Sequence, residues 1–73
     1  MSQFVIDNLI EELTELQGRI DRGTDAVIKW TSESKMSRIQ YVILKDEQLP
    51  SMRQYAEALV KRIDNLKEAL ANG

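Results

Sequence analysis

The fold is decided by residues 49–70, LPSMRQYAEALVKRIDNLKEAL. Alternating steps of three and four residues separate their apolar side chains, which are Leu49, Met52, Ala56, Leu59, Ile63, Leu66 and Leu70. Heptad spacing of this kind places the side chains on one stripe of an α-helix. Because such a stripe must be buried against another element, the sequence predicts a second helix that covers it.

A matching stripe lies in the first half of the chain. It consists of Ile6, Leu9, Leu13, Leu16, Ile20, Val27 and Trp30, and Gly23 occupies the one remaining place. A glycine inside a helix costs up to about 1 kcal/mol relative to alanine. Two interpretations of Gly23 stay open: the helix bends there, or the glycine lets a partner helix approach closely.

The two stripes are separated by a polar turn and by an ambiguous segment. The turn is Thr31-Ser-Glu-Ser34, which is rich in helix-capping residues, and Ser34 or Ser37 is expected to cap the next helix. Residues 37–48 contain a β-branched and aromatic run, but a lone strand would have no partner, so we predict helix. We therefore expect helices over about 3–30, 36–47 and 50–71, with a turn over 31–35, in one domain of residues 1–73.

The second helical arm is not expected to be straight. The apolar phase of Met36, Ile39 and Ile43 does not continue into the stripe that begins at Leu49, and Pro50 lies where the phase changes. Proline is tolerated in a first helical turn but kinks a helix interior. We predict a break or bend within about two residues of Leu49.

Self-association is expected from the size of the chain. With 73 residues, no Cys and no His, it has no disulfide and no His or Cys ligands for a transition metal, and we expect no cofactor. A single core of this size rarely contributes more than roughly 3 to 5 kcal/mol. The predicted fold is all-α: a helical hairpin with a bent or broken second arm, assembling into a homo-oligomeric helical bundle.

Charge and composition exclude several classes of function. A net charge of -2 argues against a nucleic-acid-binding protein. No stretch is long and apolar enough for a membrane span, and no secretory signal is present, so we expect a cytoplasmic protein. Without His or Cys, nucleophilic catalysis through a Ser–His or Cys–His pair is excluded. The paired carboxylates fit the solvated side of a helix, so we expect no catalytic site, no metal site and no enzyme.

The candidate ligand-binding residues are Arg53, Tyr55, Arg62 and Trp30. Arginine forks bind phosphate oxygens, and aromatic rings stack on bases. An antiparallel hairpin with Leu13 opposite Ile63 would bring Glu12 near Arg62 and Arg19 near Tyr55. These residues then either fix the register of the two helices or line a pocket where subunits meet. Trp30 is likewise either a core plug at the mouth of the hairpin or a stacking surface.

Two segments of the chain carry a family resemblance. The longer is Leu44-x-x-x-Gln48-Leu49-x-x-Met52-x-x-Tyr55-x-x-x-Leu59-x-x-Arg62-Ile63, and the other is Glu12-x-x-Glu15-Leu16-x-x-Arg19-Ile20. They resemble short proteins of tailed bacteriophages, including a crAss-like phage family. The chain departs from that pattern at Pro50 and in its longer middle.

The resemblance implies a phage or prophage accessory protein that acts in the host cytoplasm and counters host defence. One expectation is a non-catalytic homo-oligomer that sequesters a small phosphorylated signal, such as a cyclic nucleotide or an ADP-ribose derivative. The alternative is a protein–protein interaction module that inhibits or adapts a host protein through a helical face.

Overall fold

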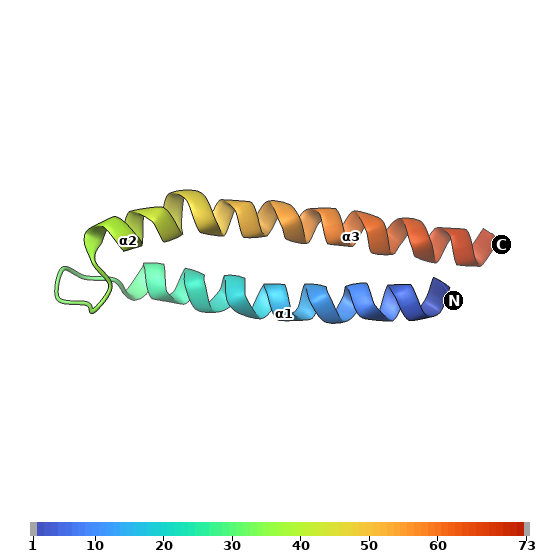
Figure 1. Ribbon diagram of the computed structural model, residues 1–73, viewed down its shortest axis with the longest axis horizontal. Helices are drawn as coiled ribbons and strands as arrows, with labels where there is room; N and C mark the ends of the chain where they lie inside the picture. Colours follow the sequence, from blue (N-terminus) through green and yellow to red (C-terminus); the bar gives the residue numbers. More distant parts are fainter. Residues whose placement is uncertain (1, 73) are drawn as a thin grey trace.

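The chain folds into an antiparallel helical hairpin whose two arms lie side by side (Figure 1). The computed structural model describes residues 2–72, as a rod with principal extents of 55 × 16 × 14 Å. Its elements are α1 (Ser2–Lys29), α2 (Arg38–Ile43), a π-helical turn η1 (Leu44–Gln48) and α3 (Leu49–Asn72). The last three follow one another directly and form the bent second arm. The predicted all-α hairpin is confirmed.

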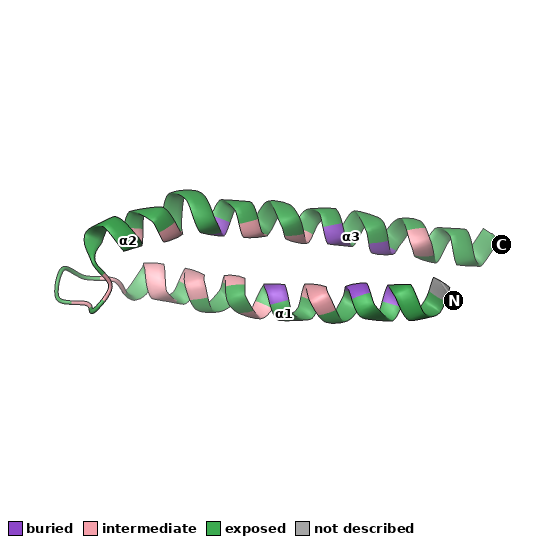
Figure 2. Cartoon of the chain, in the orientation of Figure 1, coloured by how far each residue is buried: buried purple, intermediate pink, exposed green. Residues whose placement is uncertain are grey.

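The core is a single strip between the arms (Figure 2). Its buried residues are Ile6, Leu9 and Leu16 from α1 with Leu59 and Ile63 from α3, and five half-buried residues of the two stripes pack against them. Both heptad stripes therefore meet as predicted. Leu70 is the exception, since it ends the second stripe and is 43% exposed.

Gly23 is the point of closest approach between the arms. A Cβ built on Gly23 would lie 2.8 Å from Cδ2 of Leu49, which is less than any real contact. Leu49 itself is only 2% exposed. Of the two interpretations left open by the sequence, close approach of the partner helix is the one realised, and α1 continues through Gly23 without interruption.

The bend in the second arm comes from one extra residue. The half-buried side chain of Leu44 and the buried one of Leu49 are five residues apart, one more than the heptad step of four. The π-helical turn absorbs this residue, and Leu49 N–H donates to the carbonyl of Leu44, five residues back. In an α-helix the ring of Pro50 would clash with the carbonyl four residues earlier, so a widened turn just before it is also sterically favourable. The predicted irregularity near Leu49 is thus present as a bulge rather than a break.

The apolar period of the middle segment is not the side that packs against the first arm. Ile39 and Ile43 are 71% and 39% exposed, whereas Tyr41 and Leu44 face the first arm and are half-buried. The expected 36–47 helix begins later, at Arg38, where the hydroxyl of Ser37 accepts from the Gln40 N–H at 3.2 Å. Within residues 2–72, no helix is long and apolar enough to cross a membrane.

Candidate functional site

The two long faces of the hairpin are distinguished by the contacts that cross each of them. On one face Tyr55 donates a short hydrogen bond from its hydroxyl to Glu12 Oε2. On the other, Arg53 donates from Nη2 to Thr24 Oγ1 at 3.0 Å. Residues two apart on a helix point about 200° away from each other, so Arg53 and Tyr55 cannot serve the same face of one hairpin.

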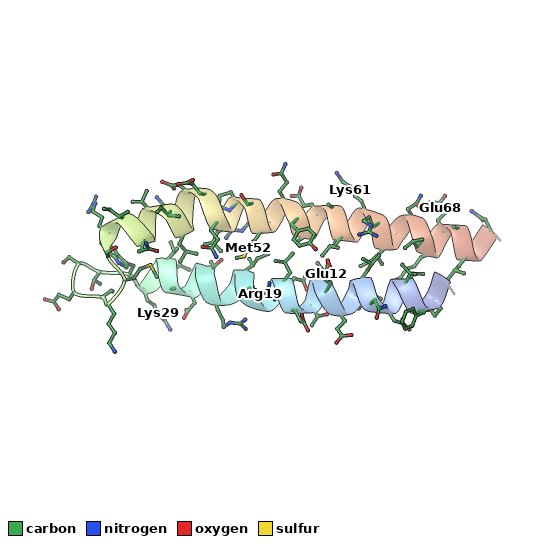
Figure 3. All side chains as sticks on the ribbon, in the orientation of Figure 1. Glu12, Arg19, Lys29, Met52, Lys61 and Glu68 are labelled. Carbon is green, nitrogen blue, oxygen red and sulfur yellow. The ribbon has the colours of Figure 1, made fainter. Side chains whose placement is uncertain are left out.

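The first of these faces carries a charged cluster around an aromatic ring. We call it the Tyr55 face and define it by Glu12, Arg19, Tyr55 and Arg62. Glu12 lies on α1 in the strip between the arms, whereas Lys61 and Glu68 extend from the outer edge of α3 (Figure 3). Tyr55 is 48% exposed, so much of its ring is open to a ligand.

The pKa of Tyr55 reflects the charges around its hydroxyl. The pKa of Tyr55 is raised above the usual 10.0, mainly because its hydroxyl donates to the Glu12 carboxylate, with desolvation and the charge of Glu12 adding to this. Arg62 and Arg19 both act in the opposite direction and lower the pKa. The predicted proximity of Arg19 to Tyr55 is therefore present.

Glu12 accepts a hydrogen bond from Tyr55, whereas Arg62 was the other candidate partner for this carboxylate. Sequence interpretation offered an ion pair between Glu12 and Arg62. Within residues 2–72 the ion pairs instead join Lys29 to Asp25 at 3.1 Å and Lys45 to Asp46 at 3.7 Å. The guanidinium groups of Arg19 and Arg62 take part in neither of these pairs.

Trp30 lies at the other end of the molecule, at the mouth of the hairpin. Its ring stacks on Tyr41 with centroids 4.3 Å apart and an interplanar angle of 15°. Its Nε1 donates to the carbonyl of Met36 at 2.8 Å, and the residue is half-buried. Trp30 directly follows the end of α1, eighteen positions after Glu12, and at the helical rise this corresponds to about 27 Å. Trp30 is thus placed as a plug, far from the Tyr55 face of the same chain.

The structure therefore divides the four predicted site residues among three places. Tyr55 and Arg62 share one face, Arg53 lies on the opposite face, and Trp30 closes the turn. Arg19 and Glu12 join the cluster from α1, and the antiparallel heptad register was the signal for them. Tyr41 was not singled out, because nothing in the sequence marks it as the stacking partner of Trp30.

The surface itself limits the chemistry. No pocket opens among residues 2–72, and over the same residues no group of three or more carboxylates is placed to hold a metal ion. What the Tyr55 face offers is a half-exposed ring whose hydroxyl is held by a carboxylate and which is flanked by guanidinium groups from both arms. This arrangement suits non-covalent recognition of a flat, anionic ligand.

Fold and surface together define a small helical hairpin with a charged, half-exposed aromatic face. The sequence matches the Sequestin family over residues 4–65. Because the match covers most of the chain, this protein belongs to the Sequestin family. No curated protein and no solved structure matches it. The family description is consistent with a sequestering role and so with the binding of some partner.

Proposed function

We propose that this chain binds and sequesters a small phosphorylated nucleotide signal, without cleaving it, as a homo-oligomer. The observation that carries the proposal is the Tyr55 face, where one ring and two arginines from different arms converge. Arg19 and Arg62 supply positive charge for phosphate oxygens, which a planar guanidinium contacts bidentately. Stacking of a base on an aromatic ring contributes roughly 1 to 3 kcal/mol.

The hydrogen bond to Glu12 prepares the ring for binding. It holds Tyr55 in one orientation before a ligand arrives, so less conformational entropy is lost when a base stacks on it. The family description agrees with sequestration, and the lack of His and Cys agrees with a protein that holds its ligand without turning it over. The ligand we propose is a cyclic nucleotide or an ADP-ribose derivative.

The biological setting is part of the same proposal. The resemblance to short proteins of tailed bacteriophages supports an accessory protein of a phage or prophage that acts in the host cytoplasm. A protein that removes a signalling nucleotide from solution would counter host defence without any enzymatic step.

Calorimetry against a panel of cyclic dinucleotides and ADP-ribose isomers tests the proposal. We expect the wild type to bind at least one of them, and Arg62→Ala to weaken that binding by about tenfold or more because a charge-assisted contact is lost. Lys61→Ala is the matched control, since it removes a neighbouring cation from the outer edge of α3 (Figure 3). The bound nucleotide should be recovered intact by mass spectrometry.

If folded protein shows no heat with any ligand of the panel, the nucleotide proposal fails. If Arg62→Ala binds a nucleotide as tightly as the wild type, the ligand does not bind at the Tyr55 face.

A second candidate function is inhibition of a host protein through a helical face. It is favoured by the flat, pocketless surface of the described residues and by large exposed side chains such as Phe4, at 69%, and Ile39, at 71%. Large apolar side chains exposed on a helix can anchor a partner protein. This candidate expects no nucleotide binding and a complex with one host protein that survives gel filtration.

A further inference from the structure

The hairpin exposes more surface than a compact chain of its mass. Its accessible surface is 5660 Å², whereas a compact monomer of 8.4 kDa has about 4,600 Å². The excess is about 1,000 Å², and a standard interface buries about 800 Å² on each partner. The area left uncovered therefore matches what one chain gives up to a single partner.

The face opposite Tyr55 carries the aliphatic side chains that such an interface needs. We call it the Ile10 face and define it by the heptad positions on the side where Arg53 bonds Thr24. Its apolar members are Ile10, Ile28, Val42 and Val60, which are 39%, 76%, 40% and 41% exposed. Four charged residues of the same face are Asp7, Asp21, Arg53 and Lys67.

The apolar residues of the two arms lie at similar positions along the long axis of the hairpin, and we call such a position a level. Gly23 faces Leu49, so each step back along α1 corresponds to a step forward along α3. On this count Ile10 lies within two residues of the level of Val60, and Ile28 within two residues of the level of Val42. Two residues correspond to about 3 Å of helix.

Two pairs of charged residues on the Ile10 face follow the same rule with opposite signs. Asp21 on α1 lies within two residues of the level of Arg53 on α3, and Asp7 lies equally near the level of Lys67. Within one hairpin, however, Arg53 bonds Thr24 rather than an acid. Among residues 2–72, the ion pairs of the structure involve neither Asp21 nor Asp7.

We propose that the Ile10 face binds a second copy of this chain, related by a two-fold axis parallel to the helices. Rotation about such an axis leaves the level of each residue unchanged. It therefore places α1 of one copy against α3 of the other. Ile10 then meets Val60 of the second copy, Ile28 meets Val42, and Asp21 meets Arg53. The result is a four-helix bundle in which every neighbouring pair of helices is antiparallel, an arrangement typical of such bundles.

This assembly also determines where ligands bind. Pairing through the Ile10 face leaves both Tyr55 faces on the outside, so a dimer offers one site on each chain. Arg53, one of the four predicted ligand-binding residues, becomes an interface residue instead. The inference rests on the self-association contained in the proposed function, but it does not depend on which nucleotide is bound.

A mixing experiment with two charge reversals tests the pairing without any ligand. Asp21→Arg places two arginines opposite each other at each contact of a homodimer, and Arg53→Asp places two acids there. Each variant alone should therefore weaken the dimer by on the order of tenfold or more. In an equimolar mixture both contacts are again between Arg and Asp, so the mixed dimer should form. A contact within one chain could not be rescued by mixing.

Light scattering and circular dichroism provide the readouts. Wild type and mixture should show about twice the 8.4 kDa chain mass, and each single variant a lower one at the same concentration. If a variant alone also unfolds, the mixture should recover helix together with mass. Lys61→Asp on the outer edge is the control and should keep the wild-type mass.

Two results would overturn the inference: a mixture that stays at the mass of the single variants, or single variants that keep the wild-type mass. Because no nucleotide is present, neither result depends on the ligand proposal. Conversely, an intact dimer that binds no nucleotide would reject the ligand and leave the Ile10 interface standing.

Discussion

At the scale of single residues, Tyr55 and Glu12 connect the chemistry of the surface to its geometry. The Glu12 carboxylate accepts from the phenol and so stabilises its protonated form, which is why the pKa of Tyr55 is raised. Arg62 and Arg19 oppose this shift. The bond to Glu12 is therefore the largest single influence on the pKa of Tyr55.

Glu12→Gln should lower the pKa of Tyr55, because it removes the negative charge and leaves both arginines in place. The measurement is an absorbance titration of the phenolate in a Tyr41→Phe background, where Tyr55 is the only tyrosine. A raised folded-state pKa means that the hydrogen bond stabilises the fold below the ordinary pKa of 10.0. That contribution is lost as the pH rises through the higher folded-state value. If the titration is unchanged by Glu12→Gln, the bond to Glu12 is not what shifts Tyr55.

The two internal glycines of α1 provide a matched pair of substitutions. At Gly18 a Cβ would meet only the Arg22 guanidinium, at 3.2 Å, so Gly18→Ala should raise stability by about 0.5 to 1 kcal/mol. At Gly23 the Cβ would meet the buried Leu49 at 2.8 Å. Overpacking a core typically costs about 1 to 3 kcal/mol, so Gly23→Ala should lower stability. Urea denaturation measures the free energy of unfolding of both variants. If Gly23→Ala raises it as much as Gly18→Ala does, the arms do not approach closely at Gly23.

Sequence reasoning reaches part of this residue-scale picture. Heptad register alone brings Glu12 and Arg19 of α1 near Tyr55 and Arg62 of α3. It does not decide which donor Glu12 accepts from, because Tyr55 and Arg62 lie one heptad apart and both reach it. It should, however, separate Arg53 from Tyr55, since an offset of two residues on a helix already places them on opposite sides.

At the scale of elements, the stability of each arm depends on its buried stripe. Leu59 and Ile63 are 1% and 4% exposed and lie among Ile6, Leu9 and Leu16. Leu59→Ala or Ile63→Ala should therefore cost about 2 to 5 kcal/mol, enough to unfold a marginal assembly. Leu70→Ala, at a stripe position that is 43% exposed, is the control and should cost much less. Circular dichroism melts that match the wild type for Leu59→Ala would show that the stripes do not form the core.

The middle element shows where prediction from sequence stops. A regular period predicts both long helices, but in the segment before Leu49 the only apolar period runs through Met36, Ile39 and Ile43. Ile39 and Ile43 are exposed and Tyr41 is half-buried, so this period does not identify the residues that contact the first arm. The stacking of Tyr41 on Trp30 is a contact between the arms, and the π-helical turn then restores the phase at Leu49. Neither is encoded in a local pattern, so tertiary packing overrides composition here.

At the scale of the whole molecule, the hairpin is more extended than a compact domain of the same length. Its radius of gyration is 16.3 Å, whereas a compact domain of 73 residues has about 11 Å. One strip of buried side chains between two helices stabilises a fold of this size by only a few kcal/mol. A second copy that covers the Ile10 face would add apolar contact along the full length of both arms.

Association of this kind makes thermal stability depend on protein concentration, because dilution favours the separated and unfolded chains. For a dimer of this size, the melting temperature should rise by about 10 °C over a hundredfold increase in concentration. The reason is that unfolding releases two chains from one assembly, so mass action enters the midpoint directly. Asp21→Arg should melt at a lower temperature with a weaker dependence on concentration, since it opposes like charges across the interface. Differential scanning calorimetry measures both. A midpoint that stays constant over the same range, together with the mass of a single chain in light scattering, would show that the hairpin is stable alone and that its excess surface serves another partner.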